Sequence, residues 1–183
     1  MVTRTQTGER APAPPSAEPR WLTPSEEQAW IATSGMLLLL PAALDGQLQR
    51  DARLSLFEYL VLSRLSMAPG RTLRMSELAG LANGSLSRLS NVVKRLERRG
   101  EVRRDPDPDD GRYTVASLTD RGWASVVEAA PGHVDAVRSY LIDLLSPDEV
   151  ETLAAIGRRV AERVRAAGAC SAAPPPYPPG SGC

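Results

Sequence analysis

Apolar residues recur at helical spacing along most of the chain, and three of the segments that they form begin with the same start signal. Residues 23–26, 55–58 and 146–149 each place a serine or threonine three positions before a glutamate. In such a capping box the hydroxyl and the carboxylate each accept a hydrogen bond from a backbone N–H at the helix start. The pattern predicts helices over residues 24–46, 56–68 and 147–165.

Two more helices and a hairpin are predicted between the second and third capping boxes. The pattern indicates a short helix over residues 76–81, a turn, and a longer helix over 85–99 that Gly100 is placed to end. Two short strands, 102–104 and 113–118, enclose a loop dense in turn residues.

A further helix begins after Thr119, with a bend or break at Pro131-Gly132. The predicted fold class is therefore mainly α with a small β-hairpin wing, a winged helix-turn-helix.

Composition places this fold in a soluble protein with an aliphatic core. The 183 residues are 42% hydrophobic, 24% charged and only 4% aromatic, and the formal net charge is zero. The proline-rich ends, residues 1–20 and 166–183, are predicted to be disordered, which leaves one domain over 21–165. Cys170 and Cys183 both lie in the second tail, so a disulfide framework is excluded.

The same features predict a cytoplasmic protein without a membrane segment. The first 20 residues lack the apolar core of a signal peptide. The most apolar run, residues 36–44, is too short to span a bilayer.

The helix over residues 85–99 has two unlike faces at 100° per residue. Leu86, Leu89, Val93 and Leu96 form an apolar stripe with Val92 at its margin. The opposite face carries hydroxyl, amide and cationic groups that suit base edges and phosphates: Ser87, Asn91, Lys94 and Arg98, flanked by Ser90 and Arg95. Residues 85–104 hold seven Lys or Arg against two Glu, although a basic face is also typical of a helix that is merely solvated.

The hairpin adds Arg112 near its tip, where a guanidinium can enter a minor groove. Asp109 or Asp110 could hold that guanidinium by a charge-assisted hydrogen bond. The alternative is a solvated acidic hairpin, because its five aspartates repel DNA unless several turn away or pair with Arg103, Arg104 and Arg112. The predicted DNA-contacting residues are Ser85, Ser87, Arg88, Ser90, Asn91, Lys94, Arg95, Asp110 and Arg112.

Three stretches resemble the multiple-antibiotic-resistance regulator (MarR) family of bacterial transcription factors. They are residues 54–62, residues 75–79, and residues 96–122, which hold an Asp-x-Arg wing signature and a Leu-Thr-x-x-Gly. The resemblance covers about residues 21–165. It implies an obligate homodimer in which helices at about 24–46 and 120–165 form the dimerisation region, beside a winged helix-turn-helix at about 54–118.

The resemblance also implies a sequence-specific regulator of transcription, a repressor that binds a pseudo-palindromic operator in duplex DNA. Many members release DNA when a small aromatic or phenolic effector enters a cleft between the dimerisation and DNA-binding regions. Four apolar residues are candidates to line such a pocket, although core packing explains them equally well: Trp30, Met36, Phe57 and Tyr59.

The sequence leaves two alternatives to DNA binding. An enzyme is disfavoured because the chain has one histidine, His133, and no metal-ligand cluster, phosphate loop or Ser-His-Asp arrangement. No catalytic residue, metal or cofactor is therefore predicted, and His133 is interpreted as a surface or packing residue. The second alternative is a winged-helix module that contacts protein without DNA.

Overall fold

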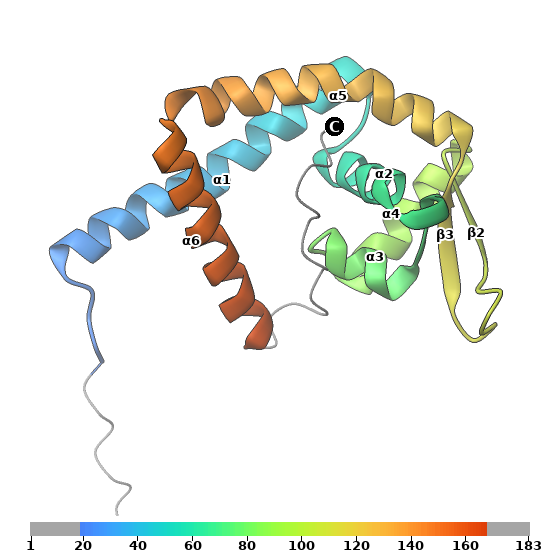
Figure 1. The fold of residues 1–183 in the computed structure, drawn as a ribbon, viewed down its shortest axis with the longest axis horizontal. Coiled ribbons are helices and arrows are strands. Elements are labelled where there is room, and N and C mark those ends of the chain that lie inside the picture. The colour runs from blue at the N-terminus through green and yellow to red at the C-terminus, as the bar shows by residue number, and fades with distance from the viewer. Residues whose placement is uncertain (1–18, 168–183) are drawn as a thin grey trace, which may run out of the picture. The chain divides into compact units, whose positions relative to one another are not determined.

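The computed structural model describes residues 19–167. These residues form a series of helices and one small sheet (Figure 1). The chain divides after Met36 into two units, and the second holds everything from residue 37 onward. The predicted disordered tails lie almost wholly outside the described residues. The elements are α1 (Pro24–Ala52), α2 (Leu56–Met67), η1 (Pro69–Arg71), β1 (Thr72–Arg74), α3 (Met75–Leu81), α4 (Leu86–Arg98), β2 (Val102–Pro106), β3 (Thr114–Leu118), α5 (Asp120–Tyr140), η2 (Ile142–Leu144) and α6 (Pro147–Ala166). This order confirms the predicted fold class.

All three predicted capping boxes are formed. The carboxylates of Glu26, Glu58 and Glu149 accept hydrogen bonds from the backbone N–H three residues earlier, at 2.8, 2.9 and 2.8 Å. The Thr23, Ser55 and Ser146 hydroxyls accept the reciprocal bonds. Thr119 caps α5 in the predicted place, with its hydroxyl accepting from the Gly122 N–H at 3.1 Å.

Helix α1 is longer than the sequence predicted, and α5 continues past Pro131-Gly132 as predicted but without the break that was allowed for there. Helix α1 continues past Gly46 to Ala52, because Leu44, Gln47 and Leu48 on its last turns are buried and hold them in place. Helix α5 continues without a break through Pro131 to Tyr140. The extension of α1 is held by packing rather than by a local signal.

Helix α1 is also more apolar than expected. Over 18 residues its mean hydropathy reaches 1.4, so its length and composition meet the criterion for a membrane-spanning helix. The short apolar run over residues 36–44 is thus part of a helix of 29 residues. The core helix of a soluble protein meets the same criterion, and so one such helix is weak evidence for a membrane.

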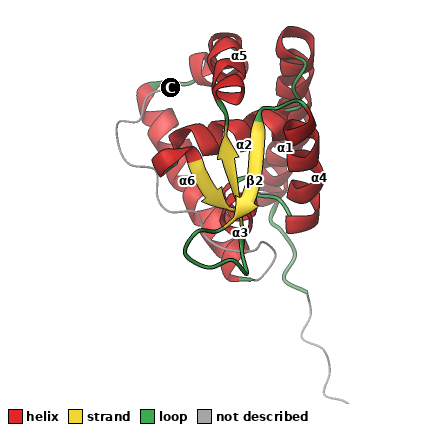
Figure 2. Cartoon of the chain, turned by 90° about the vertical axis from the view of Figure 1, so that its right-hand side faces the viewer, coloured by secondary structure: helices red, strands yellow, loops and turns green. Residues whose placement is uncertain are grey.

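The sheet has three antiparallel strands in the order β1-β3-β2, and β1 was not predicted (Figure 2). Strand β3 pairs Ser117 with Thr72 of β1 on one side and with Arg103 of β2 on the other. The hydroxyls of Thr72 and Ser117 also form a hydrogen bond at 2.9 Å. Strand β1 thereby joins the wing to the chain immediately before α3.

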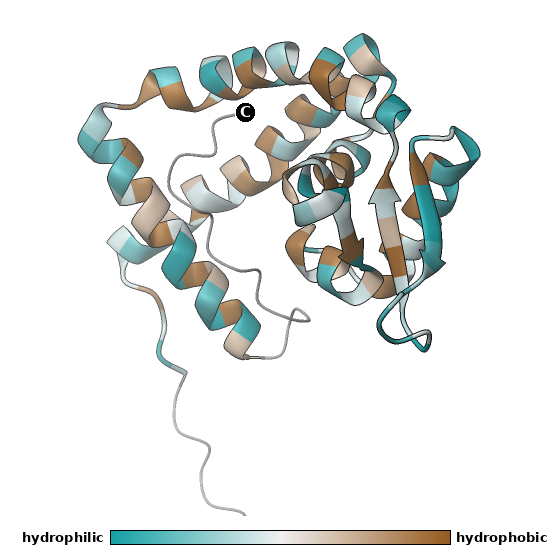
Figure 3. Cartoon of the chain, turned by 45° about the vertical axis from the view of Figure 1, so that its right-hand side comes forward, coloured by the Kyte–Doolittle hydropathy of each residue, from teal (hydrophilic) through white to brown (hydrophobic). Residues whose placement is uncertain are grey.

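The core lies among α2, α3, α4 and the sheet. Its largest fully buried side chains are aliphatic, as the composition predicted: Leu48, Leu62, Leu65, Leu78, Leu89, Leu96, Val61 and Val93. Helix α6, in contrast, has no buried residue although apolar and polar residues alternate along it (Figure 3).

We expect Gly122→Ala to destabilise the protein by about 3 kcal/mol, the upper end of the overpacking range. A Cβ at Gly122 would lie 2.1 Å from the carbonyl oxygen of Glu101 and 2.6 Å from Leu118 Cδ1, and backbone cannot move aside cheaply. Urea denaturation at fixed protein concentration measures the change. Gly111→Ala is the control, because nothing lies within 4 Å of its Cβ position. Equal stability of the two variants would show that α5 does not approach residue 101 this closely.

Candidate nucleic-acid interface

Helix α4 is held by its apolar side. Leu89, Val92, Val93 and Leu96 are buried, as the helical periodicity predicted for all but Val92, which had been placed at the margin. Leu86 was predicted on the same stripe and is instead 54% exposed, because the first turn of α4 extends beyond the edge of the core.

Both ends of α4 are fixed by local contacts. The Ser85 hydroxyl caps the start by accepting from the Arg88 N–H at 3.2 Å, and Gly100 ends the helix with a φ of 73°. In the turn before α4, Gly84 lies against the Phe57 ring, where a Cβ would come within 2.5 Å of Cζ. The turn and the helix start are thus seated on α2.

The predicted polar face of α4 is turned outward. Ser85, Ser87, Arg88, Asn91, Lys94, Arg95 and Arg98 are exposed and Ser90 is partly exposed. The Arg88 guanidinium lies over the Phe57 ring at 4.1 Å from its centroid. Lys94 and Arg98 have no ion-pair partner among residues 19–167. The outward face therefore keeps hydroxyl, amide and cationic groups available.

In the wing, Asp110 holds Arg112. The Arg112 Nε donates to Asp110 Oδ1 at 2.8 Å and Nη2 donates to Oδ2 at 2.5 Å, which confirms the predicted pairing for Asp110. The two side chains stabilise each other's charges: the Arg112 hydrogen bonds lower the pKa of Asp110, and the Asp110 carboxylate raises the pKa of Arg112. Arg112 remains highly exposed beyond this contact.

A second aspartate, Asp107, is buried at the base of the wing loop. It accepts hydrogen bonds from the Asp109 N–H at 2.9 Å and from the Arg74 guanidinium of β1. The hydrogen bond from the Asp109 N–H is the main cause that lowers the pKa of Asp107, and the hydrogen bond from Arg74 lowers it further. Asp107 thus shapes the loop that presents Arg112.

Ion pairs offset most of the acidity of this hairpin. Arg103 pairs with Asp105 at 2.6 Å, one of the pairings that would let this acidic hairpin approach DNA. Arg104, another arginine available to these aspartates, pairs with Glu97 of α4 at 2.5 Å. Arg74 of β1, which the sequence analysis did not identify, pairs with Asp107.

Helix α4 and the wing border a common hollow of about 290 Å³. Ser90 of α4 and Arg112 of the wing, both predicted contact residues, line it together. The other lining residues are Arg74, Met75, Ser76, Leu86, Arg104, Tyr113 and Thr114. Arg74, Arg104 and Tyr113 were missed because strand pairing, which local patterns do not reveal, brings them here.

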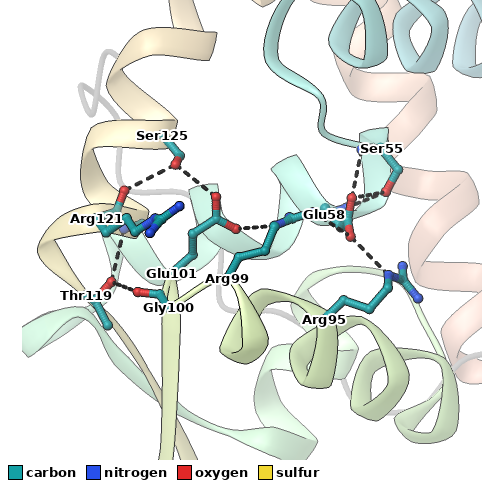
Figure 4. Close-up of polar contacts among 10 residues, drawn as sticks. Ser55, Glu58, Arg95, Arg99, Gly100, Glu101, Thr119, Arg121 and Ser125 are labelled. Carbon is teal, nitrogen blue, oxygen red and sulfur yellow. Dashed lines mark hydrogen bonds and ion pairs between the residues drawn. The ribbon is translucent and has the colours of Figure 1, made fainter.

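A buried carboxylate on α2 ties down the other end of α4 (Figure 4). Glu58 Oε1 accepts from Arg95 Nε at 3.1 Å and lies 3.5 Å from Arg99 Nη1. Arg99 Nε also donates to Glu101 at 2.8 Å, and Glu101 accepts from the Ser125 hydroxyl of α5 at 3.0 Å. Arg95, a predicted DNA contact, is thus paired with Glu58 while its side chain stays 46% exposed.

Burial alone would raise the pKa of Glu58. The Ser55 N–H, the charge of Arg99 and the hydrogen bonds from Arg95 and Ser55 together outweigh burial, so the net effect is a lowered pKa. Glu58 is therefore charged although its side chain is buried.

Two of the four candidate pocket residues, Phe57 and Tyr59, face different neighbours. Phe57 faces the turn before α4, whereas Tyr59 packs against His133 of α5 with ring centroids 4.4 Å apart. Trp30 and Met36 belong to the unit before residue 37 and are exposed. His133 is a packing residue, and its burial lowers its pKa.

Comparison with known proteins decides the family. A family model described as the MarR family matches residues 54–114. The structure is similar to that of Sco3205, a MarR family transcriptional regulator from Streptomyces coelicolor in complex with DNA. The two chains are 46% identical, with 81% of this chain and 93% of that chain covered and a TM-score of 0.78. The chain belongs to the MarR family.

Two further relatives are also transcriptional regulators. AbsC, a MarR family transcriptional regulator from S. coelicolor, is 36% identical, with 81% of this chain and 99% of that chain covered and a TM-score of 0.77. YdcH, an HTH-type transcriptional regulator from Bacillus subtilis (strain 168), is 27% identical over 117 residues, 64% of this chain and 74% of YdcH. This MarR protein is thus a transcriptional regulator rather than an enzyme.

We expect the carboxyl of Asp107 to titrate below about 3.9, the usual aspartate value, and Arg74→Leu to raise that midpoint. Because the folded pKa is lowered, this contact stabilises the wing fully above the unfolded value and is lost as pH falls through the folded pKa. Carboxyl carbon NMR measures the midpoint. Arg138→Leu, which removes an arginine paired with Asp143, is the control. An unchanged Asp107 midpoint in Arg74→Leu contradicts the assignment.

Proposed function

We propose that this protein is a cytoplasmic repressor that binds a pseudo-palindromic operator as a homodimer. In this proposal the α4 face carrying Ser87, Arg88 and Asn91 reads base edges in the major groove, and Lys94 contacts phosphate. Arg112 enters the adjacent minor groove. The single observation that carries the proposal is that α4 and the wing border one hollow with their polar and cationic residues outward. The similarity to Sco3205, whose structure contains DNA, supports it.

The homodimer is supported by apolar surface that one chain leaves uncovered. Helix α6 has no buried residue, although Ile156, Val160 and Val164 recur on it at helical spacing. A solitary helix of this kind gains little stability in water unless its apolar face is covered. In α1, Leu37, Leu38 and Leu39 are exposed as well. A second copy of the chain would cover these side chains, and two recognition helices would then lie about 34 Å apart, one turn of DNA.

Release by a small aromatic or phenolic effector stays a prediction of the family resemblance. Phe57 and Tyr59 face different neighbours, so a pocket that contains both is not the one we propose. An effector would act by favouring a dimer arrangement that does not fit the operator, since a ligand shifts only an equilibrium whose two states it binds unequally.

DNA binding by this face predicts a strong dependence on salt and on Arg112. The logarithm of the binding constant should fall linearly with log salt, at about 0.9 per phosphate contacted. Arg112→Ala should weaken operator binding roughly 5- to 150-fold, the range for a well-formed groove contact. Fluorescence anisotropy on a duplex selected from a random library measures both, with Arg138→Ala of α5 as the control. A flat salt response would favour the alternative, a winged-helix module that contacts only protein.

The homodimer predicts a particle of twice the mass of the 183-residue chain in analytical ultracentrifugation. Val160→Glu should dissociate it, because the carboxylate would enter the apolar contact that we assign to α6. Arg158→Glu places the same side chain on the opposite side of α6 and should leave the dimer intact. A wild-type monomer, or equal behaviour of the two variants, contradicts the proposed interface.

A further inference from the structure

The glutamates of the three capping boxes have different surroundings. Glu26 and Glu149 are exposed at the starts of α1 and α6. Glu58, at the start of α2, is 5% exposed and contacts two arginines of the α4 segment in addition to its cap. Capping alone does not require those arginines, since Glu149 makes the same two contacts with Ser146 from an exposed position.

The two carboxylate oxygens of Glu58 are used for different purposes. Oε2 accepts from the Ser55 N–H at 2.9 Å and is 3.0 Å from the Ser55 hydroxyl, which completes the cap. Oε1 accepts from Arg95 Nε at 3.1 Å and faces Arg99 at 3.5 Å. A buried carboxylate needs hydrogen-bond donors and opposite charges around it, because an unpaired charge that is removed from water is strongly unfavourable. The carboxylate therefore holds the arginines firmly.

Arg95 is the arginine on the outer face of α4 whose charge this contact offsets and whose guanidinium it holds toward α2. It follows Lys94 directly on α4, and its side chain is still 46% exposed, so a rotation of its flexible chain would bring the guanidinium to solvent. Arg99 is held twice, by Glu58 and by Glu101. Arg95 has no other ion-pair partner among residues 19–167, so Glu58 alone decides where its charge lies.

The position of that charge matters for discrimination between DNA sequences. Contacts with phosphate strengthen binding to every sequence equally, whereas contacts with base edges distinguish them. A flexible arginine beside Lys94 would add a phosphate contact on any duplex. Pairing Arg95 with Glu58 removes this sequence-independent phosphate contact. The residues of α4 that we propose to contact base edges are unchanged.

We propose that Glu58 is a specificity-determining residue that holds Arg95 against α2 and so keeps its charge off the DNA backbone. The inference rests on the proposed DNA-binding face of α4. It assigns Glu58 a role that is separate from capping and that a measurement of salt dependence can isolate.

The test compares Glu58→Gln with Glu149→Gln. Glutamine also serves in a capping box, so both variants keep the cap, but only Glu58→Gln removes the charge that binds Arg95. Binding is measured against salt on a duplex selected by the wild-type protein and on a scrambled duplex. In Glu58→Gln the slope should steepen by about 0.9 per bound subunit, and binding to the scrambled duplex should strengthen relative to the selected one. Glu149→Gln should match the wild type.

Arg95→Ala gives an independent check that does not depend on the buried site tolerating glutamine. Alone it should leave the wild-type slope unchanged, and combined with Glu58→Gln it should restore that slope. A wild-type slope in Glu58→Gln, or a shallower slope in Arg95→Ala alone, overturns the proposal. A wild-type protein with no salt dependence on either duplex instead contradicts the DNA-binding face on which the proposal rests.

Discussion

Burial of one side of α4 is the constraint on which the rest of the site depends. Leu89, Val92, Val93 and Leu96 are taken out of water, at about 1.5–3 kcal/mol for each fully buried side chain. This burial fixes the rotation of the helix about its axis, so the polar residues between them must point outward. The Ser85 cap, the close packing of Gly84 on Phe57 and the pairing of Arg95 with Glu58 then fix its position at both ends.

Local pairing explains how a chain of zero net charge can present a basic surface. The wing contains several aspartates, but Arg103, Arg74 and Arg112 pair with Asp105, Asp107 and Asp110. These pairs are short-range, and the field that DNA meets depends on the cations left over. Lys94 and Arg98 are such cations within residues 19–167. Neutrality of the whole chain therefore gives no guide to the charge of the interface.

The sequence predicted those features whose causes are local. Three capping boxes, the Thr119 cap and the Asp110–Arg112 pair each join residues two or three positions apart, so spacing alone reveals them. Strand β1 was missed because it is three residues long and exists through pairing with β3, more than 40 positions later. The ion pair of Arg95 was missed for the same reason. Its partner Glu58 lies 37 positions away and was visible only as a cap.

Helix α5 connects the two parts of the proposed dimeric regulator. Its first turn is packed against Glu101 through Gly122 and Ser125, and its last turn leads through η2 to α6, whose apolar residues are uncovered. Glu101 in turn holds Arg99, which Glu58 also holds. In a dimer closed by α6, a change in how the subunits meet would therefore reach the end of α4 through one continuous helix and a short chain of ion pairs.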